Sequence, residues 1–554
     1  MSTRTIRYSF YFLWIVISII QAAYTELFND EAYYWKFSQH PDLGYFDHPP
    51  IIGLLIRLGF LITGLQNEFS VRLLMIVMNA GTIYLIEKIV RPENLRLFYA
   101  LISSAIFLHI GFLAIPDTPL LFFTALFFFQ FAAYLEKEGG YKTILILSLA
   151  ISLLLYSKYH GIIIIFFSVI SNPEILKRRS FYSILLVSVL LYMPHIYWQY
   201  RNNFVTFNYH LFDRSLTEYT VSNTLDYLFT QMFLLGGIST VLLLYFCFRY
   251  KTRSAIEKAL KWNLAGVLIF FLVMTFKGRV ESNWTSVALI PMFALSFRHM
   301  QATGYAFSNL IYKLSAVSIV IILLVRTYLI VDFTNDALKL NPQMHNQKKW
   351  VSEIKEASKG LPVIFMNSYH RASKYEFYSG NPSYSLNNMM SRKNQYSIRF
   401  EEDFLGKTIF LVYNYREKAC DSIRVNNRWT TYKVIDNFIS YSSIKLCPTT
   451  SLRCLEKDKD VAFKLSVINN YKSKPDFNIN RDYPSYLSYQ FFSNNKIVSN
   501  TVTSILLTNN MIDNDIDFLI HTPADAGDYV LNISVATGDL PPTINSDNIK
   551  VKVQ

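Results

Sequence analysis

Long apolar runs dominate roughly the first 330 residues of the chain. A helix of about 20 mostly apolar residues crosses the roughly 30 Å of hydrocarbon in a bilayer. Runs of this kind lie near residues 8–24, 69–90, 97–114, 118–136, 143–157, 160–172, 181–199, 225–248, 262–276, 284–298 and 309–331. The 554-residue chain is 52% hydrophobic and 17% charged, which argues against a soluble enzyme. We predict a mainly α-helical membrane protein with about eleven to thirteen transmembrane helices.

The distribution of Lys and Arg predicts which loops face the cytoplasm. The apolar segment from Pro49 to Gly64 decides the assignment, because every later loop changes sides if this segment spans. If it lies in the interface and the N-terminus is inside, the loops richest in Lys and Arg fall in the cytoplasm. The net charge of +13 then reflects topology, and no nucleic acid partner is expected. The loops expected outside are 25–68, 116–117, 158–160, 199–223 and 277–284.

The region after residue 334 is polar and rich in Asn and Tyr, so we predict extracytoplasmic modules there. An expected helix at Lys348–Ala357 and apolar runs at Pro362–Met366 and Thr408–Tyr413 indicate an α/β module. The last hundred or so residues alternate between short apolar runs and turn residues, which is typical of a β-sandwich. The predicted domains are 1–334 in the membrane, 335–450 and 451–554.

The four cysteines give no sign of metal chemistry. Cys247, Cys420, Cys447 and Cys454 form no CxxC pair and have no nearby His at a zinc-site spacing. A disulfide between Cys447 and Cys454 and a pair of free thiols are left as alternatives.

The first expected outer loop concentrates acids, bases and aromatic rings. Asp30 and Glu31 follow the first span directly, and His48 lies among aromatic residues that include Tyr33 and Tyr45. A lone carboxylate at a membrane boundary is usually a solvated charge. The combination within about twenty residues favours a site that binds and reacts with a sugar.

Transfer of a glycosyl group from a lipid phosphate to a hydroxyl needs a base and cations that stabilise the leaving phosphate. Asp30 is the predicted base. Asp117, in Pro116–Pro119, is either a helix N-cap, a site residue or both. Some of the available cations, such as Lys277 and Arg201, have interfacial snorkelling as the alternative role. The candidate cations are His48, Lys158, His160, Arg201, His210, Arg214, Lys277, Arg279 and Arg326.

Six stretches, in order along residues 8–300, carry a family resemblance. They are Asn29–Trp35, Tyr45–Pro50, Pro116–Leu121, Ser157–Gly161, Pro194–Gln199 with His210 and Arg214 following, and Lys277–Trp284. In this ordered set the chain resembles the polytopic GT-C glycosyltransferases of the protein O-mannosyltransferase and ArnT-like group, in glycosyltransferase families 39 and 83. ArnT is the lipid A aminoarabinose transferase. The terminal β-rich region lies outside the resemblance.

The resemblance implies a GT-C fold, an inverting reaction and a polyprenyl-phosphate-linked sugar as donor. It implies that Asp30 is catalytic and that Asp117 is the second acidic position. His48, Lys158 and Arg214 would contact the lipid phosphate. Aminoarabinose transferases tend to carry Lys where this chain has His48, which counts against aminoarabinose as the donor sugar.

The predicted site is therefore external, in a multi-pass plasma-membrane enzyme of the cell envelope. Its catalytic residues are Asp30, Glu31 and Asp117. Its substrate-binding residues are His48, Lys158, Tyr159, His160, His210, Arg214, Tyr33, Tyr45, Lys277 and Arg279. No metal ligands are assigned, although a divalent metal held by Asp30, Glu31 and Asp117 stays open. The acceptor is a lipid, a glycan or a protein.

Two other functional classes compete with the enzyme. A transporter or flippase of a lipid-linked sugar would carry polar residues at mid-span and pseudo-repeated halves, whereas these spans are nearly free of charge at mid-depth. A binding protein with a degenerate catalytic part would not need Asp30 and the phosphate-binding candidates. Both observations favour the transferase.

Overall fold

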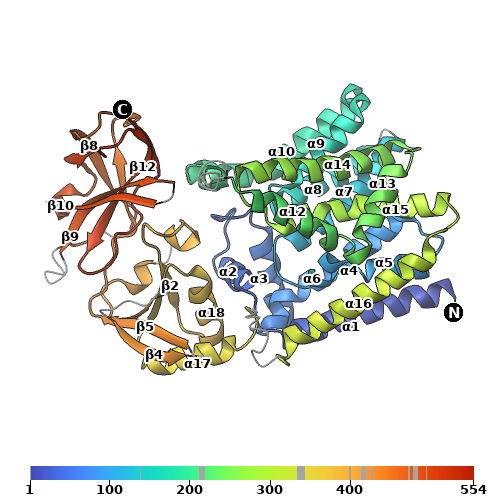
Figure 1. Cartoon of the computed structure of the whole chain (residues 1–554), viewed down its shortest axis with the longest axis horizontal. Helices are drawn as coiled ribbons and strands as arrows, with labels where there is room; N and C mark the ends of the chain where they lie inside the picture. The colour runs from blue at the N-terminus through green and yellow to red at the C-terminus, as the bar shows by residue number, and fades with distance from the viewer. Residues whose placement is uncertain are drawn as a thin grey trace. The chain divides into compact units, whose positions relative to one another are not determined.

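The structure is a computed structural model that describes residues 2–137, 139–210, 219–333, 343–398, 401–413, 420–425, 428–471, 475–477, 484–494 and 496–554. The chain forms two compact units, Met1–His345 and Asn346–Gln554 (Figure 1). The predicted boundary between residues 334 and 335 lies outside the described residues.

The first unit is built of helices, as the apolar runs predicted (Figure 1). Its helices are α1 (Thr3–Tyr24), α2 (Asn29–Gln39), α3 (Ile51–Thr63), α4 (Glu68–Val90), α5 (Leu95–Ile102), α6 (Ile106–Ile110), α7 (Asp117–Glu136), α8 (Tyr141–Ser157), α9 (Gly161–Ser171), α10 (Arg179–Arg201), α11 (Val205–Asn208), α12 (Val221–Leu234), α13 (Thr240–Arg249), α14 (Ala255–Met274), α15 (Leu289–Ala302) and α16 (Ser308–Ile330). The 3₁₀ turns η1 (Pro173–Lys177), η4 (Gly237–Ser239), η5 (Thr275–Lys277) and η6 (Ser282–Ala288) connect some of them.

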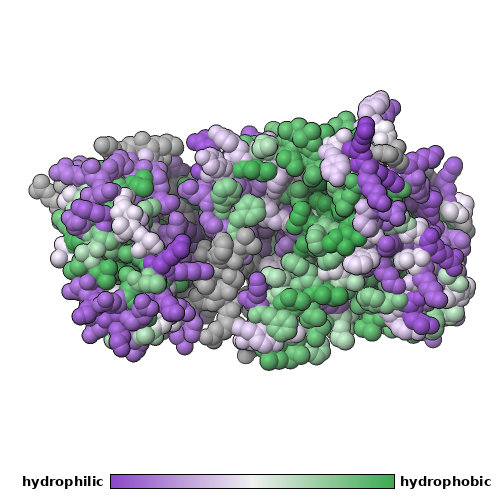
Figure 2. All heavy atoms as spheres, turned by 90° about the horizontal axis from the view of Figure 1, so that it is seen from above, coloured by the Kyte–Doolittle hydropathy of each residue, from purple (hydrophilic) through white to green (hydrophobic). Residues whose placement is uncertain are grey.

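Six helices in the described part of the chain are long and apolar enough to cross a membrane, namely α1, α4, α7, α10, α14 with η5, and α16. The pair α12 and α13 passes the same test together but bends by 114°. The helices α3, α8 and α9 are apolar and shorter. Figure 2 shows apolar side chains covering a broad part of this unit's surface. The chain is therefore a multi-pass membrane protein.

Two of the predicted runs are broken in the structure. The run 97–114 divides into α5 and α6, and the run 225–248 divides at Gly236 and Gly237. Gly237 has φ +59°, and a Cβ there would lie 2.6 Å from the carbonyl oxygen of Ser104. Only glycine fits such a conformation and such a contact, so the glycine at this position permits the break in the helix. The Ile238 N–H donates to the Ser318 hydroxyl at 3.1 Å, which satisfies one backbone group exposed by the break.

The helix α3 corresponds to the apolar segment that decided the predicted topology. It follows Pro49 and Pro50 and ends at Gly64, whose φ of +66° makes a left-handed cap. Its 13 residues rise about 20 Å. The helix is therefore too short to cross the bilayer alone.

The second unit begins with an α/β module. It contains α17 (Gln347–Ala357), β1 (Val363–Met366), α18 (Tyr369–Ser379), β2 (Ser383–Leu386), β3 (Ile409–Val412), β4 (Asp421–Val425) and β5 (Arg428–Ile435), with the turns η7 (Gln395–Ser397) and η8 (Glu401–Phe404). The sheet order is β2-β1-β3-β5-β4, and β1 pairs in parallel with β2 and β3. The predicted helix and both predicted strands of this module are present.

The rest of the unit is a β-sandwich. One sheet has the order β10-β9-β12-β13-β7 and the other β11-β8-β6, and their inner faces share one apolar core. The strands are β6 (Ile444–Pro448), β7 (Cys454–Leu455), β8 (Asp460–Asn469), β9 (Ser485–Ser493), β10 (Lys496–Leu506), β11 (Asn514–His521), β12 (Gly527–Thr537) and β13 (Ile549–Val553), with η9 (Asn509–Met511) before β11. Since β6 pairs with β8, the sandwich includes residues before 451. Cys447 on β6 and Cys454 on β7 are both free thiols.

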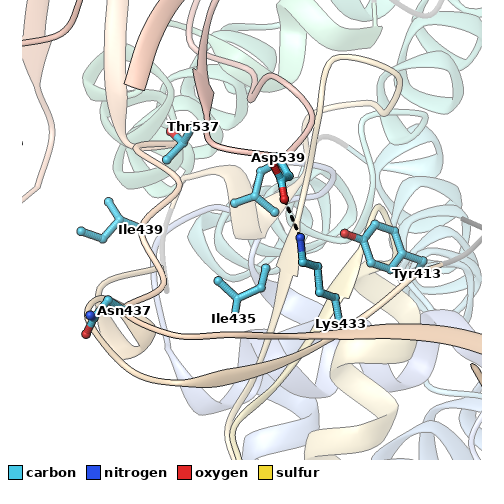
Figure 3. Close-up of a pocket in the computed structure, with 8 residues that line it drawn as sticks. Tyr413, Lys433, Ile435, Asn437, Ile439, Thr537 and Asp539 are labelled. Atoms are coloured by element: carbon cyan, nitrogen blue, oxygen red, sulfur yellow. Dashed lines mark hydrogen bonds and ion pairs between the residues drawn. The ribbon is translucent and has the colours of Figure 1, made fainter. Parts of the chain in front are cut away.

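The two modules of this unit meet along a polar seam. Lys433 Nζ on β5 lies 2.6 Å from Asp539 Oδ2, just after β12. Figure 3 shows these side chains pointing toward each other across a small pocket, with Tyr413 beside the lysine. A second ion pair joins Lys393 and Asp547 at 2.8 Å. The Lys393 ammonium lowers the pKa of the Asp547 carboxyl, which favours its ionised form.

Candidate active site

The predicted acidic pair begins α2, and its two members differ in environment. Glu31 is fully buried, whereas Asp30 is partly exposed in the same first turn. A carboxylate at a helix N-terminus is stabilised by the helix dipole. Both acids therefore start at a favourable position, and their partners decide what each can do.

Glu31 is held by four hydrogen bonds. Arg72 on α4 donates to both carboxylate oxygens, at 2.7 Å from Nε and 2.5 Å from Nη2. The backbone N–H groups of Phe28 and Ala114 each donate to it at 2.9 Å. These contacts favour a structural role for Glu31 over the predicted catalytic one.

Arg72 also binds the end of α1. Its Nη1 donates to the carbonyl oxygens of Ala22 and Thr25 at 2.9 and 2.6 Å, and its Nη2 donates to that of Glu26 at 3.0 Å. All five guanidinium N–H groups are thus used. The buried Arg72 fixes the turn between α1 and α2, and with it the position of Asp30.

The aromatic residues of the first loop are packed inside it. Tyr45 stacks on Phe37 with ring centroids 4.1 Å apart, and its hydroxyl donates to the Phe37 carbonyl at 3.0 Å. Tyr33 is buried and donates to Asp47 Oδ2 at 2.7 Å. His48 is partly exposed, with its ring against Tyr34. Tyr33 and Tyr45 therefore shape the loop, while His48 lies at its surface.

Asp117 and Lys158 form a buried ion pair. Lys158 Nζ lies 2.9 Å from Asp117 Oδ1 and 3.1 Å from Oδ2. Asn283, in η6, donates from Nδ2 to Asp117 Oδ2 at 2.8 Å. Asp117 begins α7, and Lys158 follows α8. The structure brings together two predicted site residues that are 41 positions apart.

The remaining predicted cations occupy different surroundings. Lys277 and Arg279 are exposed, and Arg279 lies 3.8 Å from Glu281. The His160 ring packs between Phe271 and Trp284. Arg214 lies outside the described residues.

Tyr159 and His210 both belong to a hydrogen-bonded network behind the first loop. The Tyr159 hydroxyl lies 2.9 Å from His195 Nε2, and Gln199 Nε2 donates to it at 2.8 Å. His210 Nε2 lies 3.2 Å from the Asp47 carbonyl oxygen. Tyr159 and His210 therefore both have hydrogen-bond partners within the protein.

Sequence reasoning missed three residues that organise the site: Arg72, Asn283 and Gln199. Asn283 and Gln199 lie inside stretches that carried the family resemblance, but neutral amides were passed over in favour of charged neighbours. Arg72 lies within an apolar run and had a signal of its own, since an intramembrane arginine normally has a buried partner. Among the described residues, no three His, Cys, Asp or Glu side chains are grouped so that they hold a metal ion.

Comparisons with known proteins bear on the family and the fold. Residues 47–198 match the family described as dolichyl-phosphate-mannose-protein mannosyltransferase. The lipid A galacturonosyltransferase RgtD of Rhizobium johnstonii is 25% identical over 299 residues, which cover 50% of this chain and 61% of that relative. The alignment thus spans less than two thirds of the relative.

Solved structures define the fold. ArnT from Cupriavidus metallidurans in the apo state superposes with a TM-score of 0.57 at 11% identity, covering 78% of this chain and 98% of ArnT. The same protein bound to undecaprenyl phosphate gives 0.55 at 12% identity, with the same coverage. The chain therefore has the GT-C fold of membrane glycosyltransferases. These findings confirm the predicted resemblance to the protein O-mannosyltransferase and ArnT-like group.

The Asn283 contact leads to a first prediction. Asn283→Leu removes a hydrogen bond to a buried carboxylate, a loss worth about 1.5–3 kcal/mol or roughly a 10- to 150-fold effect. We expect kcat/KM for sugar transfer to fall within that range while the protein still purifies folded. Initial rates at varied donor concentration measure it, with the exposed Ser222→Ala as control. An unchanged kcat/KM would show that the contact does not support the site.

Proposed function

We propose that this chain is an inverting glycosyltransferase that moves a sugar from a polyprenyl-phosphate carrier to an acceptor hydroxyl on the outer face of the membrane. The observation that carries the proposal is the bond between Glu31 and the Ala114 N–H, at 2.9 Å. It joins the first turn of α2, which carries Asp30, to the segment that leads into Asp117. The start of α2 therefore lies against the segment that leads into α7.

Asp30 is the proposed base. Its carboxylate takes the proton of the acceptor hydroxyl, and the acceptor oxygen attacks the anomeric carbon of the donor. The bond from that carbon to the phosphate oxygen breaks, and the carrier phosphate leaves with the electron pair. A single displacement from the opposite side inverts the anomeric configuration. General-base catalysis of this kind contributes about 10²–10⁴-fold.

Lys158 is the proposed anchor for the leaving phosphate. An ammonium has three N–H donors, and Asp117 receives two of them from Lys158. The third is the donor we assign to a phosphate oxygen. Asp117 holds the ammonium in place, and Asn283 in turn donates to Asp117. His48 and Arg214 are proposed to complete the phosphate contacts, and charge-assisted hydrogen bonds from these side chains would stabilise the leaving oxyanion.

The relatives support the donor, and their names point to a lipid and to a protein as acceptors. ArnT binds undecaprenyl phosphate in its solved complex. RgtD is named for lipid A, and the matching family is named for mannosyl transfer from a dolichyl phosphate to protein. We therefore propose a polyprenyl-phosphate sugar as donor and a glycolipid, surface glycan or protein as acceptor. A transporter of a lipid-linked sugar would need neither a base nor an anchor for a leaving phosphate.

Transfer is tested directly with purified protein in lipid nanodiscs. The protein is incubated with a panel of radiolabelled polyprenyl-phosphate sugars and a membrane extract, and the label is followed from the carrier into glycolipid, glycan and protein fractions. We expect one donor to lose its label into one fraction. If no donor is consumed across the panel, while the same protein moves a labelled donor across proteoliposome membranes, the transporter replaces the transferase.

A further inference from the structure

The segment from His195 to His210 holds the first loop through alternate carbonyl groups. His195 Nδ1 lies 2.8 Å from the oxygen of Leu43, Thr206 Oγ1 lies 3.2 Å from that of Tyr45, and His210 Nε2 lies 3.2 Å from that of Asp47. His195 and Thr206 are buried. Three points of attachment along five loop residues fix the loop that carries His48.

The loop backbone lies directly on this segment. A Cβ at Gly44 would be 2.6 Å from Trp198 Cε3 and 2.9 Å from His195 Cε1. The His195 and Trp198 rings are nearly parallel, at an interplanar angle of 7°. Only glycine allows the loop backbone to come this close to the two rings.

Gln199 connects two of the three attachment points. Its Nε2 lies 2.8 Å from the Tyr159 hydroxyl and 2.8 Å from Thr206 Oγ1. The Tyr159 hydroxyl in turn lies 2.9 Å from His195 Nε2. Two chains of hydrogen bonds, here called arms, thus begin at this amide group. One runs through Tyr159 and His195 to Leu43, and the other runs through Thr206 to Tyr45.

The direction of every hydrogen bond in these arms follows from the carbonyl ends. A carbonyl oxygen only accepts, so His195 donates from Nδ1 and Thr206 donates from its hydroxyl. His195 Nε2 is then the acceptor, and the Tyr159 hydroxyl donates to it. Both hydroxyl oxygens accept from Gln199, whose NH₂ group has one hydrogen for each. An acceptor in place of the amide would compete for both hydroxyl hydrogens, whereas a group that neither donates nor accepts would leave them on the arms.

We propose that Gln199 is a positioning residue for the transfer reaction. Its amide sets the direction of both arms and so orients the Gly44–His48 loop toward the donor phosphate. This inference rests on the proposed function, in which His48 contacts that phosphate. Gln199 itself is buried behind the loop and acts only through it.

The test replaces the amide by groups of similar size. In Gln199→Glu the carboxylate only accepts, so the Tyr159 and Thr206 hydroxyls turn toward it. The Tyr45 carbonyl then loses the Thr206 donor, and His195 Nε2 loses the Tyr159 donor that holds its ring in the tautomer facing Leu43. Two neutral hydrogen bonds correspond to about a 5- to 150-fold effect. We expect kcat/KM to fall within that range, mainly through a higher KM for the donor. Activity relative to the native protein rises as the pH falls, because a protonated carboxyl donates one hydrogen again. His195 Nε2, 3.4 Å from Gln199 Nε2, acts in the same direction, since on protonation it donates to the new side chain while Nδ1–H stays on Leu43.

Gln199→Met is the matched control, because it removes both amide donors without adding a strong acceptor or a titrating group. Its relative activity is expected to lie between those of the native protein and Gln199→Glu and not to change with pH. Hydrogen exchange of the loop amides at 42–48 is measured in parallel in the absence of donor, and faster exchange in Gln199→Glu than in Gln199→Met supports the proposed positioning role of Gln199. Native transfer rates at every pH, together with unchanged loop exchange, would overturn it.

The two proposals fail in distinguishable ways. If the native protein consumes no donor, the proposed function fails, and hydrogen exchange of the loop amides alone tests whether Gln199 positions the loop. If Gln199→Glu does not purify folded, Thr206→Val cuts one arm at constant shape. Faster exchange near Tyr45 in Thr206→Val then supports the proposal that these hydrogen bonds position the loop, and unchanged exchange contradicts it.

Discussion

Asp30→Asn is expected to lower the rate of sugar transfer by about 10²–10⁴-fold, the contribution of a general base. The amide keeps the shape of the side chain and the start of α2 but cannot take a proton from the acceptor. Donor binding should persist, since Lys158, His48 and Arg214 are the proposed phosphate contacts. The effect should therefore appear in kcat, with KM for the donor little changed. Single-turnover release of labelled carrier measures the chemical step.

Asp226→Asn provides the control for this substitution. Asp226 is exposed on α12, and its carboxylate accepts only from Ser222, at 3.2 Å, among the described contacts. The control should transfer sugar at the native rate. If Asp30→Asn retains more than about a tenth of native activity, the carboxylate does not act as a general base and another group must take the proton.

The fold was predictable where it depends on apolar periodicity alone. The apolar runs lie on helices, and the strands at 363–366 and 409–412 lie where short apolar runs predicted them. The break at Gly236–Gly237 was missed because hydrophobicity continues across it. Two adjacent glycines were the available signal, since glycine weakens a helix and permits a positive φ. How many helices cross the membrane stays a prediction.

The sequence pointed to site residues only where their side chains are charged. The pairing of Asp117 with Lys158 joins two residues that were chosen for their charge. Lys277 and Arg279 were chosen for the same reason, yet their neutral neighbour Asn283 is the residue that reaches Asp117. A residue's partner depends on tertiary packing, which linear spacing does not contain. Whether these residues act as predicted is a question for the variants proposed above.

Glu31 shows the same limit more sharply. In the sequence it is one of two adjacent carboxylates, indistinguishable in type from Asp30. In the structure it lies against Arg72, 41 residues away, with both side chains fully shielded from solvent. Neighbouring helix positions point in different directions, so one carboxylate of the pair is buried and the other is partly exposed. The pair thus divides into one residue for structure and one proposed for chemistry.

Arg72→Met is expected to cost about 3–5 kcal/mol of stability, because it leaves the Glu31 charge buried without its counter-charge. The carbonyls of Ala22, Thr25 and Glu26 also lose their donor. The unfolding midpoint, followed by tryptophan fluorescence in one detergent, should fall by several degrees. Transfer activity should fall further than the folded fraction does, since the turn that positions Asp30 is released.

The charge is isolated by adding Glu31→Gln to the same protein. The Phe28 and Ala114 N–H groups donate to different oxygens of Glu31, so the double variant keeps an acceptor for one of them and removes the buried charge. It should therefore recover part of the lost stability. Arg72→Lys keeps the positive charge without the planar fork and cannot reach Glu31 and the three carbonyls together. It should therefore be more stable than Arg72→Met and still transfer sugar slowly. If the double variant is no more stable than Arg72→Met, the unpaired charge is not the source of the loss, and the lost contacts to the carbonyls of Ala22, Thr25 and Glu26 are.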